Sequence, residues 1–190
     1  MQNAINYSHT MLNELIEQFP NGLFIDATLG NGNDAIHILK HPKFTGTLLA
    51  FDIQPQALQT SQTKITQLNI AAHRYQLIGD SHANVDQYLA IDASLQGAIF
   101  NLGYLPKGNH QITTQADSTI QALEKMQGYL VKNGKIILVV YPGHQAGQIE
   151  KVRLLEELSQ WPQETFQILQ YQFINQINNP PFVIIIEKTI

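Results

Sequence analysis

The turn from Ala27 to Asp34 combines two glycines with amide and acidic side chains, between a strand candidate at 22–26 and a helical pattern at 35–39. A glycine-bearing turn between a strand and a helix lets the backbone approach a ligand closely. A diphosphate would require a full GxGxxG sequence at a helix N-terminus. Here Thr28 takes the first small position, and an acid at the helix start repels phosphate. The turn therefore suits a cationic ligand, such as the sulfonium and ammonium groups of S-adenosylmethionine.

Acidic residues also follow the next two strand candidates. Asp52 lies in the segment AFDIQ, where its carboxylate can accept both hydroxyls of a ribose, and Gln54 follows two residues later. Asp80 in the segment GDSH is placed to accept from an adenine amine, with Ser81 and His82 beside it. Each has an ordinary alternative, since Asp is a common turn former and His82 can be a helix cap or a surface residue. Their succession at neighbouring strand ends favours an adenosyl site.

Strand and helix patterns alternate along most of the chain. An amphipathic helix is predicted over 5–19, where apolar residues recur at three- and four-residue spacing until Pro20-Asn21-Gly22. Further strands are predicted at 47–52, 75–78, 97–102 and 135–141, and helices at 55–68, 84–89, 118–131 and 145–160. A turn is expected at Lys132-Asn133-Gly134. This alternation is typical of a parallel sheet with helices on both faces.

The C-terminal part breaks the alternation. Two strand-like runs, 166–174 and 182–188, follow one another without a helix, so the sheet should finish with an antiparallel pair. A dinucleotide oxidoreductase sheet would continue with strand-helix units instead. The predicted fold is α/β: a Rossmann-like class I methyltransferase with a seven-stranded, mostly parallel sheet and helices on both faces. We expect one S-adenosylmethionine-dependent methyltransferase domain over 1–190, with the N-terminal helix 5–19 packed on it.

Composition excludes several classes of protein. The 190 residues are 44% hydrophobic and carry a formal net charge of only −4, which excludes disorder and a polybasic protein that holds nucleic acid by bulk charge. The absence of Cys excludes disulfides, thiolate zinc sites and a Cys nucleophile. The His residues lack metal-ligand spacing and no Gly-x-Ser-x-Gly occurs, so we expect neither a metal nor a hydrolase. We expect a soluble cytoplasmic protein without a membrane partner.

Five segments together resemble the MnmM family of small class I methyltransferases, whose members were long labelled rRNA methylases. They are DATLGNGND at Asp26–Asp34, FDIQ at Phe51–Gln54, GDSH at Gly79–His82, NLGYLP at Asn101–Pro106 and YPGH at Tyr141–His144. The resemblance covers nearly the whole chain, and the last two segments are its more specific parts.

The resemblance implies S-adenosylmethionine as methyl donor, with S-adenosylhomocysteine as product, and a tRNA anticodon stem-loop as partner. It implies methylation of 5-aminomethyl-(2-thio)uridine at the wobble position to 5-methylaminomethyl-(2-thio)uridine. With the residue arguments above, the expected donor-site residues are Asp26, Thr28, Gly30, Asn31, Gly32, Asn33, Asp34, Asp52, Gln54, Asp80, Ser81 and His82.

Asn101 ends the fourth strand candidate, where amino-directed methyltransferases place an acidic or amide side chain. Its amide oxygen, or the backbone carbonyl of Leu102 or Gly103, can accept a proton from an amine and orient it. Tyr104 can stack on a flipped uracil. Asn101 as a turn residue and Tyr104 as ordinary packing are the alternatives.

Beyond the fifth strand candidate, Tyr141 and His144 would face the same site, and His144 can take the released proton near neutral pH. A purely structural role for His144 is an equal alternative. We predict Asn101, Tyr104 and His144 as catalytic residues. The predicted substrate-binding residues are Leu102, Gly103, Leu105, Pro106, Lys107 and Tyr141.

Binding of tRNA requires that the 11 Lys and Arg gather against 15 acidic residues. Lys107 and His110 lie near the predicted site, whereas Lys132, Lys135 and the pair Lys151/Arg153 are also explained as solvated surface residues. A homodimer that pools two weak basic patches is a hypothesis. Three alternatives stay open: a ribosomal RNA base methyltransferase, a dinucleotide-dependent oxidoreductase and a non-catalytic binding module on the same fold.

Overall fold

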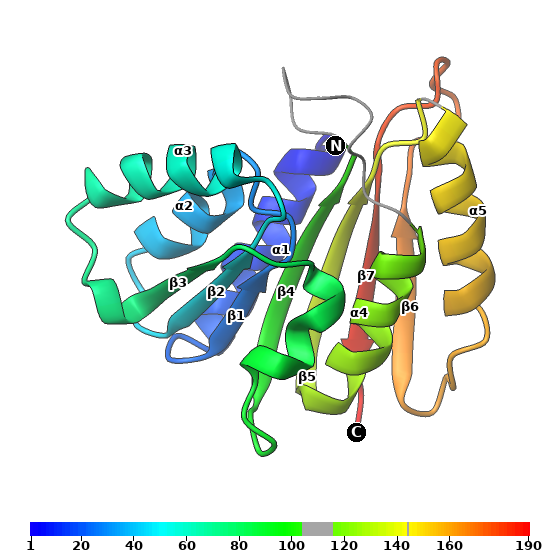
Figure 1. The fold of residues 1–190 in the computed structure, drawn as a ribbon. Coiled ribbons are helices and arrows are strands. Elements are labelled where there is room, and N and C mark those ends of the chain that lie inside the picture. Colours follow the sequence, from blue (N-terminus) through cyan, green and yellow to red (C-terminus); the bar gives the residue numbers. More distant parts are fainter. Residues whose placement is uncertain (104–115, 144) are drawn as a thin grey trace.

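The fold is built on one seven-stranded sheet with strand order β3-β2-β1-β4-β5-β7-β6. A computed structural model describes residues 1–103, 116–143 and 145–190. The first five strands pair in parallel, and β5-β7 and β7-β6 pair antiparallel, as predicted from the missing helix near the C-terminus (Figure 1). The strands are β1 Leu23–Asp26, β2 Thr47–Phe51, β3 Tyr75–Ile78, β4 Leu95–Leu102, β5 Leu130–Val140, β6 Phe166–Tyr171 and β7 Phe182–Lys188.

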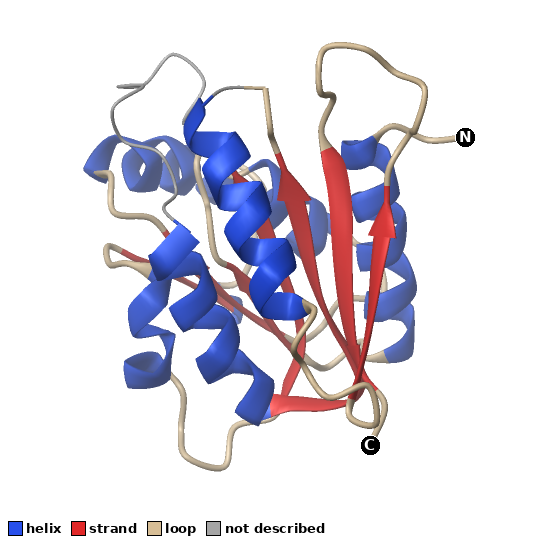
Figure 2. Ribbon diagram, turned by 90° about the vertical axis from the view of Figure 1, so that its right-hand side faces the viewer, coloured by secondary structure: helices blue, strands red, loops and turns tan. Residues whose placement is uncertain are grey.

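Helices cover both faces of the sheet (Figure 2). One face carries α1 Ala4–Gln18, α2 Asn33–Lys40 and α3 Pro55–Thr66, and the other carries the 3-10 helix η2 His82–Tyr88, α4 Ala116–Tyr129 and α5 Gln145–Leu158. A short 3-10 turn, η1 Ala72–Arg74, precedes β3. Among the described residues, no helix is both long and apolar enough to cross a membrane.

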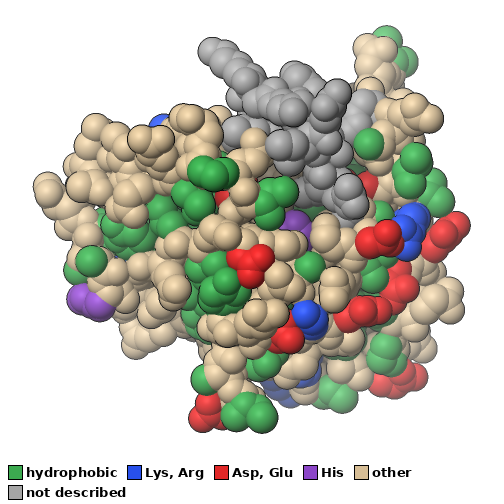
Figure 3. All heavy atoms as spheres, in the orientation of Figure 1, with side chains coloured by type: hydrophobic (Ala, Val, Ile, Leu, Met, Phe, Trp, Pro, Cys, Tyr) green, Lys and Arg blue, Asp and Glu red, His purple; other side chains and the backbone are tan. Residues whose placement is uncertain are grey.

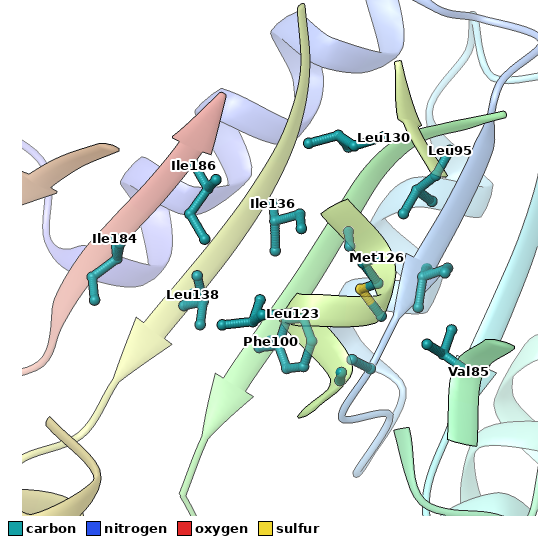
Figure 4. Packing of buried hydrophobic residues seen from close by; sticks show 14 of the residues in the cluster. Val85, Leu95, Phe100, Leu123, Met126, Leu130, Ile136, Leu138, Ile184 and Ile186 are labelled. Atoms are coloured by element: carbon teal, nitrogen blue, oxygen red, sulfur yellow. The ribbon is translucent and has the colours of Figure 1, made fainter. Parts of the chain in front are cut away.

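Successive residues of the central strands enter two separate hydrophobic clusters. In β4, Phe100 packs toward α4, whereas Ile99 packs toward α1 and α2. In β5, Leu138 and Val139 divide in the same way, and Figure 4 shows Phe100, Leu123, Met126 and Leu138 together in the α4 cluster. Because both faces are buried, the strands read as continuous apolar runs.

Gly97 lets α1 pack closely on the sheet. A Cβ atom there would lie 2.6 Å from Leu15 Cδ2 of α1 and 2.7 Å from Phe24 Cε1 of β1. Burial of Leu12, Leu15 and Ile16 holds α1 over β5, β7 and β4. The N-terminal helix is therefore fixed along the face of the central strands.

Two local predictions differ from the structure. The segment Lys132–Gly134 is not a free turn: it lies inside β5, and its pairing with β4 shifts between Leu130 and Lys135 while Asn133 takes a left-handed φ of 63°. The helix predicted at 84–89 is the 3-10 segment η2, which begins at His82. The Ser81 side chain caps its start by accepting from Ala83 N, and the non-helical backbone angles of Asn84 put a kink in it. Neither difference alters the strand order of the sheet.

Candidate functional site

The turn after β1 needs glycine at both of its left-handed positions. Gly30 has φ 49° and Gly32 has φ 76°, and Gly32 is the N-cap of α2. A Cβ atom on Gly32 would come within 2.7 Å of Ser61 Oγ on α3. Ser61 Oγ donates to Gly30 O at 3.0 Å, and Lys64 Nζ donates to Asn31 O at 2.7 Å. The turn is therefore held against α3 in one backbone shape.

Asp26 is fully buried at the end of β1. Its two carboxylate oxygens accept from the backbone N–H groups of Thr28 and Ala35, each at 3.1 Å. Burial, and next the charge of Asp34, raise the pKa of Asp26 well above its ordinary value. This carboxylate braces the turn from beneath, so its part in a ligand site is to shape the loop.

Asp52 follows β2 and spans two segments. Its oxygens accept from Gly30 N and Gln54 N, both at 2.8 Å. Burial raises the pKa of Asp52, while the bonds from Gln54 and Gly30 act in the opposite direction. A carboxylate oxygen can accept more than one hydrogen bond, so the half-buried Asp52, with one bond to each oxygen, retains acceptor capacity. It is suited to the two adjacent hydroxyls of a ribose.

Asp80 follows β3, and its partners among the described residues are local. It accepts from Ser81 N at 2.7 Å, Asn84 Nδ2 at 3.0 Å and Tyr88 Oη at 2.9 Å. The bond from Asn84, followed by that from Ser81, lowers the pKa of Asp80. The ionised carboxylate is partly exposed and can accept from a ligand amine at the outer end of the edge.

His82 is buried between the turn and the sheet. Its Nδ1 lies 2.9 Å from Ala27 O, and its ring packs edge-on against Phe100 at 5.4 Å. Burial lowers the pKa of His82, which keeps the ring neutral with Nδ1–H as donor to the carbonyl. Its Nε2 is buried without a hydrogen-bond partner among the residues that the structure describes. His82 is thus an internal tie between the turn and β4, and Ser81 is the helix cap.

Asn101, near the carboxyl end of β4, is held from three sides. Its backbone N–H donates to Thr28 Oγ1 at 2.6 Å, its Nδ2 donates to Asp34 Oδ2, and its Oδ1 accepts from Tyr141 Oη at 3.2 Å. An ionised carboxylate only accepts, so the NH₂ group must face Asp34, and this contact fixes which way the amide points. Burial, and then the charge of Asp34, raise the pKa of Tyr141 to about 12, so its hydroxyl stays a donor.

Asp34 is joined to α1 by a residue that the sequence did not single out. His9 Nε2 lies 2.7 Å from the second oxygen of Asp34, and the His9 ring stacks on His37 with centroids 4.0 Å apart. Asp34 and His37 share a face of α2 because they are three residues apart. Nothing local in the sequence places His9 against them, since 25 residues separate it from Asp34.

The structure brings together part of the predicted site. Asn101, Tyr141, Thr28 and Asp34 form one hydrogen-bonded group, and Asp52 is bonded to the adjoining turn. Leu102 is buried toward α4, so only its backbone can face a substrate, and Gly103 lies beside the Tyr141 ring. The predictions for Tyr104, Leu105, Pro106, Lys107, His110 and His144 fall outside the described residues.

Three of the candidate RNA-binding cations already have partners. Lys135 Nζ lies 2.5 Å from Glu187, Arg153 pairs with Asp117, and Lys151 lies over the Phe182 ring at 5.5 Å. Figure 3 shows acidic side chains among the basic ones over α4 and α5. This side of the molecule is therefore a surface of mixed charge. Within the described ranges, no three His, Cys, Asp or Glu residues group as a metal site.

Comparison with known proteins finds similarity to proteins that are named as RNA methylases or methyltransferases. Residues 48–187 match the family model described as "Putative rRNA methylase". The chain is 30% identical to a chloroplastic tRNA (mnm(5)s(2)U34)-methyltransferase of Arabidopsis thaliana over 97% of this chain and 69% of that protein. A ribosomal RNA small subunit methyltransferase H of Burkholderia cenocepacia is 29% identical over 54% of this chain but only 33% of its own length.

Solved structures share the whole architecture. A protein titled putative rRNA-methylase from Clostridium thermocellum superimposes with a TM-score of 0.92 at 39% identity, covering 99% of this chain and 98% of that one. A protein from Streptococcus mutans, described as a putative methyltransferase and solved in complex with SAH, has a TM-score of 0.87 at 36% identity, with 99% of each chain covered. The predicted class I methyltransferase fold is confirmed by these likenesses and by the strand order.

Proposed function

We propose that this chain methylates the amine of 5-aminomethyl-(2-thio)uridine at the tRNA wobble position. The proposal starts from the family: the chain belongs to the putative rRNA methylase family and is an S-adenosylmethionine-dependent RNA methyltransferase. The observation that carries the proposal is the Asn101 amide, fixed between Asp34 and Tyr141 at the end of β4. An oriented amide oxygen suits an amine nucleophile, and the Arabidopsis relative bears the name of this reaction.

The residues present fit an adenosyl sulfonium better than a dinucleotide. The turn carries a buried acid, Asp34, in the first turn of α2, where a diphosphate would need positive potential. Asp52 supplies ribose acceptors beside it, and Asp80 is an acceptor at the next strand end. We assign the donor to the edge formed by β1, β2 and β3.

S-adenosylmethionine, when bound, supplies a methyl group on a sulfonium that is already an activated leaving group. The chain's own task is then to hold the amine and keep its lone pair available. Asn101 Oδ1 can accept an N–H from the amine, because the Tyr141 hydroxyl occupies one of its two lone-pair directions. Asp34 contributes negative charge beside the amide, which favours the cationic sulfonium of the donor.

The proposal also covers the part of tRNA that is bound, the location of the protein and its assembly. We assign the anticodon stem-loop as the part of tRNA that is bound, a cytoplasmic location and a single catalytic domain over 1–190. With Lys135 and Arg153 engaged in ion pairs, one protomer gathers little free positive charge over α4 and α5. A homodimer that pools two surfaces remains the assembly we propose.

Methylation of a ribosomal RNA base is the second candidate. It is favoured by the partial match to methyltransferase H of Burkholderia cenocepacia. That match covers a third of the other protein, whereas the match to the tRNA enzyme extends over nearly all of this chain. The tRNA substrate is therefore the stronger proposal.

The test is transfer of label from S-adenosylmethionine to three substrates: tRNA with a wobble aminomethyl group, the same tRNA without it, and ribosomal RNA. Nucleoside mass analysis should find one added methyl group on the aminomethyl nucleoside only. Label in a ribosomal RNA base, or unchanged aminomethyl nucleoside, contradicts the proposal. Gln163→Ala, at an exposed amide in the loop before β6 and at the opposite edge of the sheet, is the control for Asn101→Ala.

A further inference from the structure

A chain of side chains runs from α1 to the end of β4. His9 bonds one oxygen of Asp34 at 2.7 Å, and Asn101 donates to the other oxygen. Tyr141 then donates to Asn101 Oδ1 at 3.2 Å. Four separate segments thus meet in one line of hydrogen bonds, and each side chain constrains the orientation of the next.

The His9 ring is itself held in place. It stacks on His37 at 4.0 Å with an angle of 20° between the planes, and His37 Nε2 lies 2.8 Å from Asn13 Oδ1 on α1. Burial, and next the neighbouring His9, lower the pKa of His37, so the stack carries at most one charge near neutral pH. The side chain of His9 is 25% exposed and that of Asp34 only 10%. A polar group this well buried and paired serves orientation better than solvation.

We propose that His9 is a positioning residue for methyl transfer: by bonding one oxygen of Asp34, it fixes the carboxylate that orients the Asn101 amide. The N-terminal helix α1 therefore contributes a residue to the part of the site around Asn101, where the methyl group would be transferred. The inference rests on the proposed function, because the amide is given its task there. His9 acts through Asp34 and needs no contact with substrate.

A proton-transfer role for His9 would have a different consequence. A glutamine at position 9 has an N–H donor at the same number of bonds from the backbone as His Nε2, but it cannot take up a proton near neutral pH. A leucine fills similar space and has no donor. The pair His9→Gln and His9→Leu thus separates orientation from proton transfer and from packing.

The experiment measures kcat and KM with aminomethyl-bearing tRNA and the Kd for S-adenosylhomocysteine. His9→Leu should lower kcat at least about tenfold, as expected for a misoriented reactive group, with KM and Kd changed less than about twofold. His9→Gln should restore most of the rate. His73→Leu, at an exposed His of η1, is the matched control and should behave as the unaltered chain.

A double-mutant cycle protects the test against a general loss of folding. If His9 acts through Asn101, His9→Leu should cost little further rate in an Asn101→Ala background. Full additivity of the two losses overturns the inference, as does an unchanged kcat for His9→Leu or an equal loss in His9→Gln. Absence of methylation by the unaltered chain would instead overturn the proposed function, so the two failures are distinguishable.

Discussion

The two ends of the candidate site are built in different ways. At the β4 end, Asp34, Asn101, Tyr141 and His9 hold one another through contacts between segments far apart in the chain. At the β3 end, the partners that Asp80 has within the described part of the chain lie at most eight positions away. Cross-braced side chains are rigid, whereas a locally supported and partly exposed carboxylate keeps free acceptor capacity. The first end suits the orientation of a reacting group, and the second suits recognition of a ligand.

Asn101→Ala should have the largest effect on rate. It removes the oriented amide and leaves Asp34 with one partner fewer, so we expect kcat to fall by about 100-fold or more. The Kd for S-adenosylhomocysteine, measured by calorimetry, should change less than about threefold, because donor recognition lies at the other end. A large loss of donor affinity with an unchanged kcat would reverse the assignment of the two ends.

Asp52→Ala should have the largest effect on donor affinity. Loss of two hydrogen bonds to a charged acceptor predicts a Kd weakened by about 30-fold. Gly30 N also loses its partner, so a thermal melt should accompany the titration. Asp92→Ala, at an exposed carboxylate, is the control. If both substitutions change the donor Kd equally, Asp52 is not the ribose acceptor.

Donor affinity should also depend on pH through Asp52. The ionised carboxylate is the ribose acceptor, and burial raises its pKa above the ordinary value. Affinity should therefore be complete at neutral pH and fall as the pH decreases through this raised pKa, by up to about tenfold per pH unit. Calorimetric titration across the acidic range checks this, and Asp52→Asn should remove the dependence. An acid limb that persists in Asp52→Asn belongs to another group.

Tyr141→Phe should lower kcat moderately. It removes one long hydrogen bond to Asn101 Oδ1 while Asp34 still holds the amide, so kcat should fall by about fivefold. Because the pKa of Tyr141 is raised to about 12, the unaltered enzyme should show no alkaline limb from this hydroxyl below that range. Single-turnover rates between neutral and alkaline pH test both statements, with Tyr129→Phe as control.

Asp80→Ala should have the smallest effect. Its carboxylate is partly exposed and makes one ligand contact at most in our account, so the Kd for S-adenosylhomocysteine should weaken by about threefold. A comparison with adenosine and with inosine as competitors shows whether the exocyclic amine is the group recognised. If Asp80→Ala weakens the binding of adenosine and of inosine equally, Asp80 does not recognise the exocyclic amine.

The sequence predicted the parts of this molecule that depend on neighbours in the chain. Alternating apolar runs located the strands, and the missing helix before 182–188 predicted the antiparallel end of the sheet. Asp52 and the glycine turn lie together, as expected because strand ends gather at one edge of a parallel sheet. The left-handed backbone at Gly30 and Gly32 is likewise a local property.

The sequence did not predict contacts that depend on packing between distant elements. His9 lies on a helix whose position is set by the close approach of Leu15 to Gly97, and no spacing rule connects it with Asp34. Asp26 was predicted as a donor-site residue, and what the sequence did not predict is its full burial and its bonds from the backbone N–H groups of Thr28 and Ala35. The cations at 135 and 153 likewise lie opposite acids that are remote in sequence.

The most direct test of the central claim is a crystal structure of this protein with S-adenosylhomocysteine. We predict that both ribose hydroxyls bond Asp52 and that the thioether sulfur lies on the side of Asn101. Adenosine bound away from Asp52, or a sulfur directed away from Asn101, would contradict the assignment of a recognition end and a reacting end.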